Sequence, residues 1–183
     1  MVNIIDLVPI MIGMPKGLKQ TSSTVAIGFS VDESANNTFT QSSVDLNLSP
    51  LDREVFVVLA INLDPFTPDS QDGVDSKVES SLTTTSQTAV ANLSNANCLA
   101  ASGNFIKAGG NLAGGVAFQS LGAETPPATL EYIGIIATND FFIQVKGTGN
   151  TSAKGMDGKL YGYRAVADAD IYAALVQSEV LSA

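Results

Sequence analysis

The strongest strand pattern in the chain lies at residues 54–63 (EVFVVLAINL). The run from Val55 to Ile61 is uninterrupted, rich in β-branched residues and closed by Asp64-Pro65, as is typical of a buried strand. Alternation assigns Val55, Val57, Leu59, Ile61 and Leu63 to one face and Phe56, Val58, Ala60 and Asn62 to the other. Both faces are therefore apolar, and we expect another part of the chain or another subunit to cover the second.

Alternating polar and apolar residues predict further strands on both sides of this run. In the segment 24–32, apolar residues at every second position predict a half-buried antiparallel strand. Other predicted strands span 44–48, 98–101 with 105–106, 116–121, 130–137, 141–146 and 159–167, and a weakly apolar edge strand or short helix spans 78–93.

Two connections near the C-terminus carry specific signals. The segments 130–137 and 141–146 are separated by three residues, which predicts a hairpin. Asp168 is predicted to cap a final short helix, because Ile171 and Leu175 follow at helical spacing. A terminal strand is the alternative for this last segment.

These elements together predict an all-β fold, an antiparallel β-sandwich of the jelly-roll kind with about eight strands. A single domain spans residues 21–183, and residues 1–20 form an apolar N-terminal arm. Asp6, Pro9 and Pro15 interrupt the arm, and no basic leader precedes it, so the pattern favours an extended arm over a signal peptide or a membrane span.

Composition narrows the function classes. Lys and Arg together number 9 against 18 Asp and Glu, and the resulting net charge of −9 argues against direct contact with nucleic acid or with an anionic membrane. The sequence has no His, which removes His-based triads and His-ligated metals. Cys98 is the single cysteine and is predicted to be a small buried residue, so no internal disulfide forms.

An acidic loop is the one candidate metal site. Asp64, Asp69, Asp72 and Asp75 carry the oxygen ligands that Ca²⁺ prefers, but their spacing departs from the D-x-[DN]-x-[DN]-G pattern. A solvated, turn-rich loop is the favoured interpretation. The Gly-rich stretches at 109–115 and 146–155 fit no phosphate-binding pattern, so no metal or other cofactor is expected.

Four N-x-[ST] sequons occur, at Asn36, Asn47, Asn92 and Asn150. Asn36 and Asn150 are the expected exposed acceptors in a glycosylating host, whereas Asn47 is placed in a predicted strand and should be less accessible.

From Val25 to Ala167 the chain resembles the single jelly-roll virion proteins in strand number, length and two-faced apolar strands. The resemblance implies self-assembly, with loops facing solvent or neighbouring subunits. Many capsid proteins that touch the genome carry a basic N-terminal arm, but residues 1–20 contain only Lys16 and Lys19. The expected partners are therefore copies of the chain and other structural proteins rather than naked nucleic acid or a membrane.

The leading hypothesis is a non-enzymatic structural protein, a viral capsid or virion-surface subunit held by apolar interfaces and located in the virion. The alternatives are a carbohydrate- or receptor-binding β-sandwich outside a cell or on its surface, and a His-free carboxylate hydrolase. In the hydrolase, Asp140, Asp168 and Asp170 would be the acids, although turn and cap roles explain them more simply. The predicted interface residues are Ile4, Ile5, Leu7, Ile10, Met11, Ile12 and Met14 in the arm, together with Phe56 and Phe142.

Overall fold

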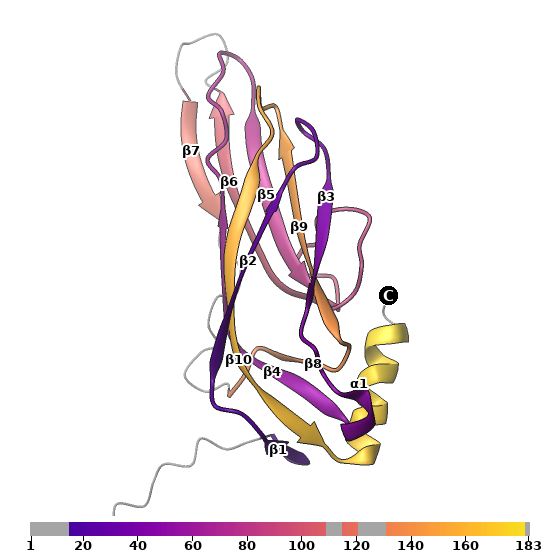
Figure 1. Cartoon of the computed structure of the whole chain (residues 1–183). Coiled ribbons are helices and arrows are strands. Elements are labelled where there is room, and N and C mark those ends of the chain that lie inside the picture. The colour runs from indigo at the N-terminus through magenta and orange to yellow at the C-terminus, as the bar shows by residue number, and fades with distance from the viewer. Residues whose placement is uncertain (1–14, 109–114, 121–130, 182–183) are drawn as a thin grey trace, which may run out of the picture.

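The computed structural model describes residues 15–108, 115–120 and 131–181, which form ten strands, one short 3-10 helix and one α-helix (Figure 1). The first five strands are β1 (Leu18–Gln20), β2 (Val25–Asp32), β3 (Thr40–Asp45), β4 (Glu54–Pro65) and β5 (Ser76–Thr83). The others are β6 (Cys98–Ala108), β7 (Gly115–Ser120), β8 (Gly134–Ile136), β9 (Asp140–Thr148) and β10 (Gly155–Ala167). The 3-10 helix η1 spans Pro50–Asp52 and the helix α1 spans Ala169–Leu181.

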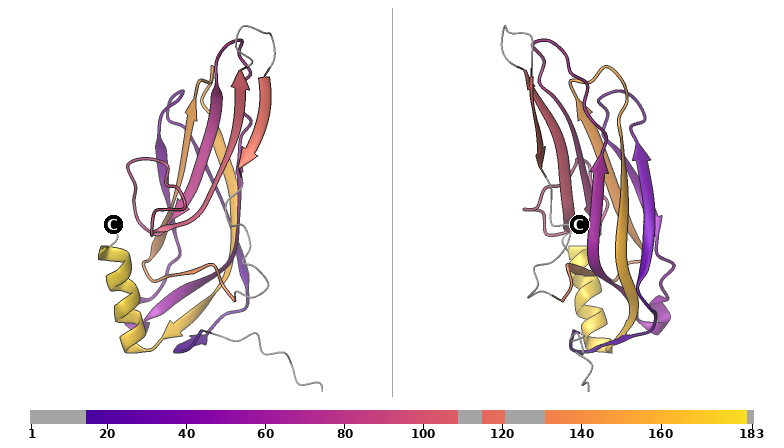
Figure 2. Two further views of the ribbon diagram at one scale, coloured as in Figure 1. Left: turned by 180° about the vertical axis from the view of Figure 1, so that it is seen from behind. Right: turned by 90° about the vertical axis from the view of Figure 1, so that its left-hand side faces the viewer.

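The strands form two antiparallel sheets packed face to face (Figures 1 and 2). The first sheet has the order β2-β10-β4-β8 and the second has the order β3-β9-β5-β6-β7. Except for the consecutive strands β5, β6 and β7, the chain changes sheet at each step from β2 to β10. This crossing order of two interlocked four-stranded sheets defines the jelly roll and confirms the predicted fold class.

Two strands extend this eight-stranded arrangement. β1 pairs with the end of β10 through Leu18 and Ala167, so the sheet begins within the segment assigned to the arm. β7 pairs with β6 and lengthens the second sheet at its edge. The remainder of the arm, residues 1–14, lies outside the described residues.

A β-bulge in β4 changes which of its side chains face the core. Ala60 pairs with Tyr161 but Val58 pairs with Gly162, so Leu59 is an extra residue in the ladder. The side chains between the two sheets are therefore Phe56 and Val58 before the bulge and Ile61 and Leu63 after it. The strict alternation expected from the sequence was wrong because one inserted residue reverses the faces.

Phe56 consequently occupies the core of its own subunit. Its side chain is 1% exposed and belongs to the cluster between the sheets, so its prediction as an exposed interface anchor was wrong. The ring lies over Gly162 on the neighbouring strand, where a side chain would collide with it.

The opposite face of β4 is covered by the same chain. Val55 and Val57 are fully buried in a second cluster, against the partly buried Ile171 and Leu175 of α1. The predicted helix is thus confirmed, and the Asp168 carbonyl accepts the hydrogen bond from Tyr172 N–H at its start (2.9 Å). Because α1 shields this face, part of the surplus apolar surface expected from the sequence is satisfied within one copy (Figure 2).

A buried carboxylate fixes the far end of α1. Glu179 is 7% exposed and accepts hydrogen bonds from the backbone N–H groups of Ala137 and Thr138, each at 3.0 Å. These two residues connect β8 to β9. Burial raises the pKa of Glu179, and the two amide hydrogen bonds oppose that rise.

Two other sequence-based assignments differ from the structure. β8 and β9 do not form the predicted hairpin, because β8 pairs with β4 and β9 pairs with β3 and β5. The segment 78–93, predicted as an edge strand or a helix, contains the inner strand β5 followed by a loop. Small hydroxyl side chains such as Ser81 and Thr83 are buried there and weaken the apolar pattern that marks an inner strand.

We expect Gly162→Ala to destabilise the fold by about 1–3 kcal/mol, the range for overpacking a core. A Cβ at this position would lie 2.4 Å from the Phe56 ring and 2.3 Å from the Val57 carbonyl oxygen. Gly28→Ala is the matched control, since a Cβ there meets nothing within 4 Å. Denaturant unfolding measures both variants, and an equal effect of the two would contradict the packing assigned to Phe56.

Replacing Glu179 should change how stability depends on pH. Because the folded state raises its pKa, the contribution of the protonated carboxyl is complete below about pH 4 and is lost as the pH rises through the raised pKa. Glu179→Gln should remove this dependence, whereas Glu131→Gln, at an exposed position, should retain it. The measurement is the free energy of unfolding between pH 4 and pH 7, and parallel profiles for wild type and Glu179→Gln would contradict the assignment.

Candidate assembly surfaces

The remaining predicted interface residues fall into two groups. Phe142 is half-buried on the outer face of the second sheet, because its neighbours Phe141 and Ile143 point into the core. Its role at an interface stays a prediction. The seven arm residues from Ile4 to Met14 lie outside the described residues.

One side of the sandwich is open. β8 pairs only with Phe56 to Val58 of β4, so within the described residues β4 from Leu59 to Pro65 has a strand partner only in β10. The facing part of the other sheet is formed by β6 and β7. A hydrogen bond from the Asn104 side-chain amide to the Pro65 carbonyl (2.7 Å) connects the two sheets here.

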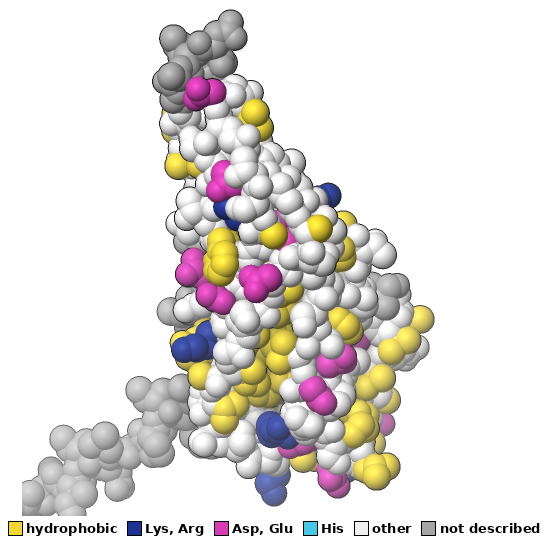
Figure 3. Space-filling model, turned by 45° about the horizontal axis from the view of Figure 1, so that its top comes forward, with side chains coloured by type: hydrophobic (Ala, Val, Ile, Leu, Met, Phe, Trp, Pro, Cys, Tyr) yellow, Lys and Arg dark blue, Asp and Glu magenta, His cyan; other side chains and the backbone are white. Residues whose placement is uncertain are grey.

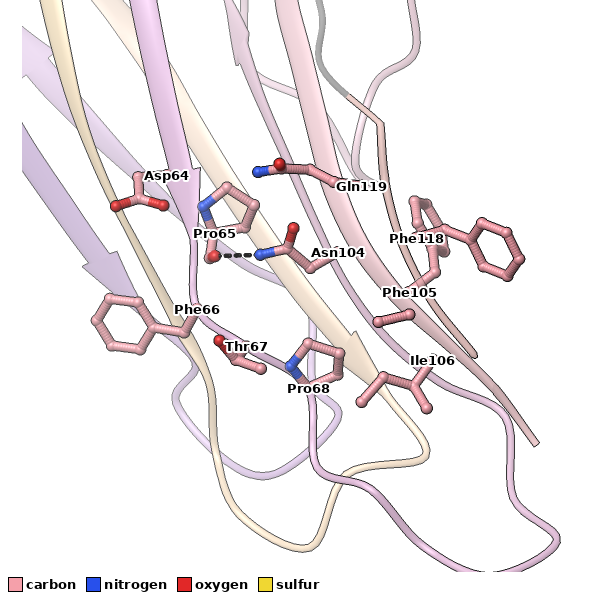
Figure 4. A pocket seen from close by; sticks show the side chains of 11 residues that line it. Asp64, Pro65, Phe66, Thr67, Pro68, Asn104, Phe105, Ile106, Phe118 and Gln119 are labelled. Atoms are coloured by element: carbon pink, nitrogen blue, oxygen red, sulfur yellow. Dashed lines mark hydrogen bonds between the residues drawn. The ribbon is translucent and has the colours of Figure 1, made fainter. Parts of the chain in front are cut away.

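A groove of about 680 Å³ occupies this open side (Figure 4). Its walls come from the end of β4 with the following residues, from β6 and from β7. Phe66 at one border of the groove is 43% exposed, and Phe118 at the other border is 55% exposed. The two rings point away from each other, and Phe118 lies beside Phe105 on the outer face of the second sheet (Figure 4). Large apolar side chains thus remain in contact with water at the borders of the open side.

β7 forms the outer border of this groove, and its residues are more exposed than those of any other described strand. All six of its residues are exposed, and none belongs to either core cluster. Phe118 lies opposite Phe105 in the β6–β7 register, and Val116 is 61% exposed. The sequence predicts a strand at 116–121 but contains no signal that its apolar side chains stay outside the core.

The described residues form no basic surface on the face that Figure 3 draws. On the face drawn in Figure 3, Lys and Arg stand singly among more numerous acidic side chains. Within the described part of the chain, four ion pairs, including Lys154–Asp69 and Arg164–Glu54, engage some of the basic side chains. Among the described residues, no helix has the length and hydrophobicity needed to cross a bilayer.

The acidic loop does not gather its carboxylates. Asp69 accepts hydrogen bonds from Lys154 Nζ (2.5 Å) and from the Thr151 backbone and hydroxyl groups, whereas Asp75 pairs with Lys107. These contacts lower the pKa of both carboxyls. Asp64 and Asp72 are exposed, and across the described ranges no three acidic or Cys side chains come together as a metal site would require.

Asn150 ties together the loops at this end of the sandwich. It is 5% exposed, and its side chain accepts the Asp69 N–H (2.9 Å) and donates to the Lys77 carbonyl (2.9 Å). Its assignment as an exposed glycan acceptor was therefore wrong. Asn47, which was expected inside a strand, instead follows β3 in an exposed left-handed conformation with φ 50°.

No protein-family model matches the chain, and no curated protein matches its sequence. In structure, the chain is similar to apo chimpanzee polyomavirus VP1, with 6% identity, a TM-score of 0.43 and coverage of 82% of this chain and 99% of that chain. It is also similar to desmodium yellow mottle tymovirus, with 12% identity, a TM-score of 0.25 and coverage of 85% of this chain and 95% of that chain. The jelly-roll assignment rests on the strand order of this chain itself.

Asp69 should make the fold sensitive to acid. Its lowered folded-state pKa stabilises the protein above the unfolded-state pKa of about 4, and this contribution is lost as the pH falls below that value. The stability difference between wild type and Asp69→Asn should therefore be largest near neutral pH and shrink on acidification. Asp72→Asn, in the same loop but exposed, is the control; thermal unfolding from pH 3 to pH 7 tests both variants.

Proposed function

We propose that this chain is a structural subunit of a virion, located in the shell or on its surface, that assembles with copies of itself and with other structural proteins. Its work is burial: neighbours remove from water the apolar surface that one copy leaves open. The proposal assigns the chain no catalytic step, no cofactor and no direct contact with nucleic acid or with a membrane.

The strand order supports this proposal by reducing the number of candidate functions. Double-sheet jelly rolls serve as viral capsid domains, lectins and cupins. The sequence contains no His, the commonest metal ligand in proteins, which argues against metal-centred enzyme chemistry of the cupin kind. The remaining choice is between an assembling subunit and a binding module.

The exposed aromatic side chains at the borders of the groove favour an assembling subunit. Phe66 stays exposed directly after a half of β4 that has a strand partner on one side only, and Phe118 stays exposed on the edge strand β7. Exposed aromatic side chains beside a free strand edge mark an interaction site, and a subunit interface would bury such side chains.

The test is the mass and shape of the full-length protein, measured by light scattering and negative-stain imaging across concentration. Regular closed particles or a closed oligomer are expected. Phe66→Ser should weaken assembly without lowering the unfolding temperature. Leu51→Ser, at a side chain 97% exposed on η1, should leave assembly unchanged. A protein that stays monomeric at high concentration would refute the proposal.

A carbohydrate- or receptor-binding module is the second candidate. The observation in its favour is the pair of phenyl rings, Phe105 and Phe118, on adjacent strands of an exposed sheet edge. Aromatic faces of this kind stack against sugar rings in binding modules. Binding on a glycan array that disappears in Phe118→Ala, by a protein that remains monomeric, would favour this candidate instead.

A further inference from the structure

β7 is an edge strand with one free side. β7 is held by its pairing with β6, and within the described residues no strand pairs with its other side. A free strand edge presents a row of backbone N–H and C=O groups that can pair with another chain. Because Val116 and Phe118 are also exposed, pairing at this edge would bury apolar side chains together with the backbone groups.

β7 lacks the features that normally keep an edge strand from pairing. The sequence GVAFQS contains no charged residue and no proline, and its six ladder pairs with β6 are regular. The other sheet borders differ. β1 and β8 have three residues each, and β2 and β3 both end on an aspartate, at Asp32 and Asp45.

The neutral sequence of β7 allows a second copy of the chain to occupy this edge. Two copies that each carry a net charge of −9 repel one another, and they can meet closely only where the contact itself is neutral. β7 supplies such a neutral strip over its whole length. Two identical edges related by a two-fold axis run antiparallel, which is the geometry of the ladder already formed by β6 and β7.

The N-terminal arm is the competing occupant, and its sequence suits this edge less well. Pro9 and Pro15 have no N–H group and would break a ladder, and Asp6 adds a charge. The described chain also begins beside β1, at the end of the sandwich opposite to β7 (Figure 1).

We infer that two copies of this chain pair antiparallel through β7, joining their second sheets into one continuous sheet and placing the Phe118 and Val116 side chains of the two copies next to one another on one face of that sheet. This inference rests on the proposed assembly function and names one contact within it. This contact stops at two copies, because each copy has one free β7 edge and the pairing uses both edges.

Hydrogen exchange and mass measurements on the full chain test the pairing. In the assembled protein, amides of the peptide 115–120 should exchange more slowly than in the protein diluted to monomer. Phe118→Lys places like charges at the contact and should weaken the self-association by at least about tenfold, as expected for a buried aromatic anchor. Leu51→Lys introduces the same charge at an exposed apolar side chain elsewhere and should leave the association unchanged, and Phe118→Leu should largely preserve it.

The outcomes separate this inference from the proposed function. If the protein assembles but the β7 amides exchange equally fast in assembly and monomer, the pairing is wrong and the assembly function stands. If Ile10→Asp in the arm abolishes the protection of β7 while the assembled mass is retained, the arm is the occupant and the pairing is again wrong. A protein that never assembles removes both proposals.

Discussion

The pairing of β4 with β10 organises this molecule. These are the two longest described strands, and the large apolar side chains of β4 divide between two hydrophobic clusters on opposite faces of their sheet. The bulge at Leu59 makes that division, sending Phe56 and Ile61 to the same side although they are five positions apart. Gly162 completes the arrangement, because its lack of a side chain leaves room for the Phe56 ring.

The sequence carries much of the architecture. The strands at β2, β4 and β10 follow from alternation or from a β-branched run, and the final helix follows from its cap and spacing. Three features escape such reasoning for physical reasons. A bulge depends on the partner strand, the position of a strand in its sheet depends on long-range pairing, and β5 buries hydroxyl side chains that pair with Gln144 and backbone groups instead of apolar ones.

The sequence predicts that an apolar surface exists but not which residues form it. An excess of apolar side chains is visible in the composition, but most of that excess, including Phe56, is absorbed by the chain itself through α1 and the sheet interface. The exposed part lies at Phe66 and Phe118, which sequence alone does not separate from core phenylalanines. The short β8 leaves half of β4 without a second strand partner, and β7 is the last described strand of the other sheet. The loop end, in contrast, is closed by polar contacts through Asn150 and Glu33.

The separation of the two clusters by one sheet has a consequence for how the molecule opens. The cluster under α1 shares no side chain with the cluster between the sheets, and the helix reaches the sandwich mainly through the former. Partial opening that releases the helix therefore leaves the inner cluster packed, whereas melting of β4 destroys both. The C-terminal helix can then reorganise while the jelly roll keeps its shape.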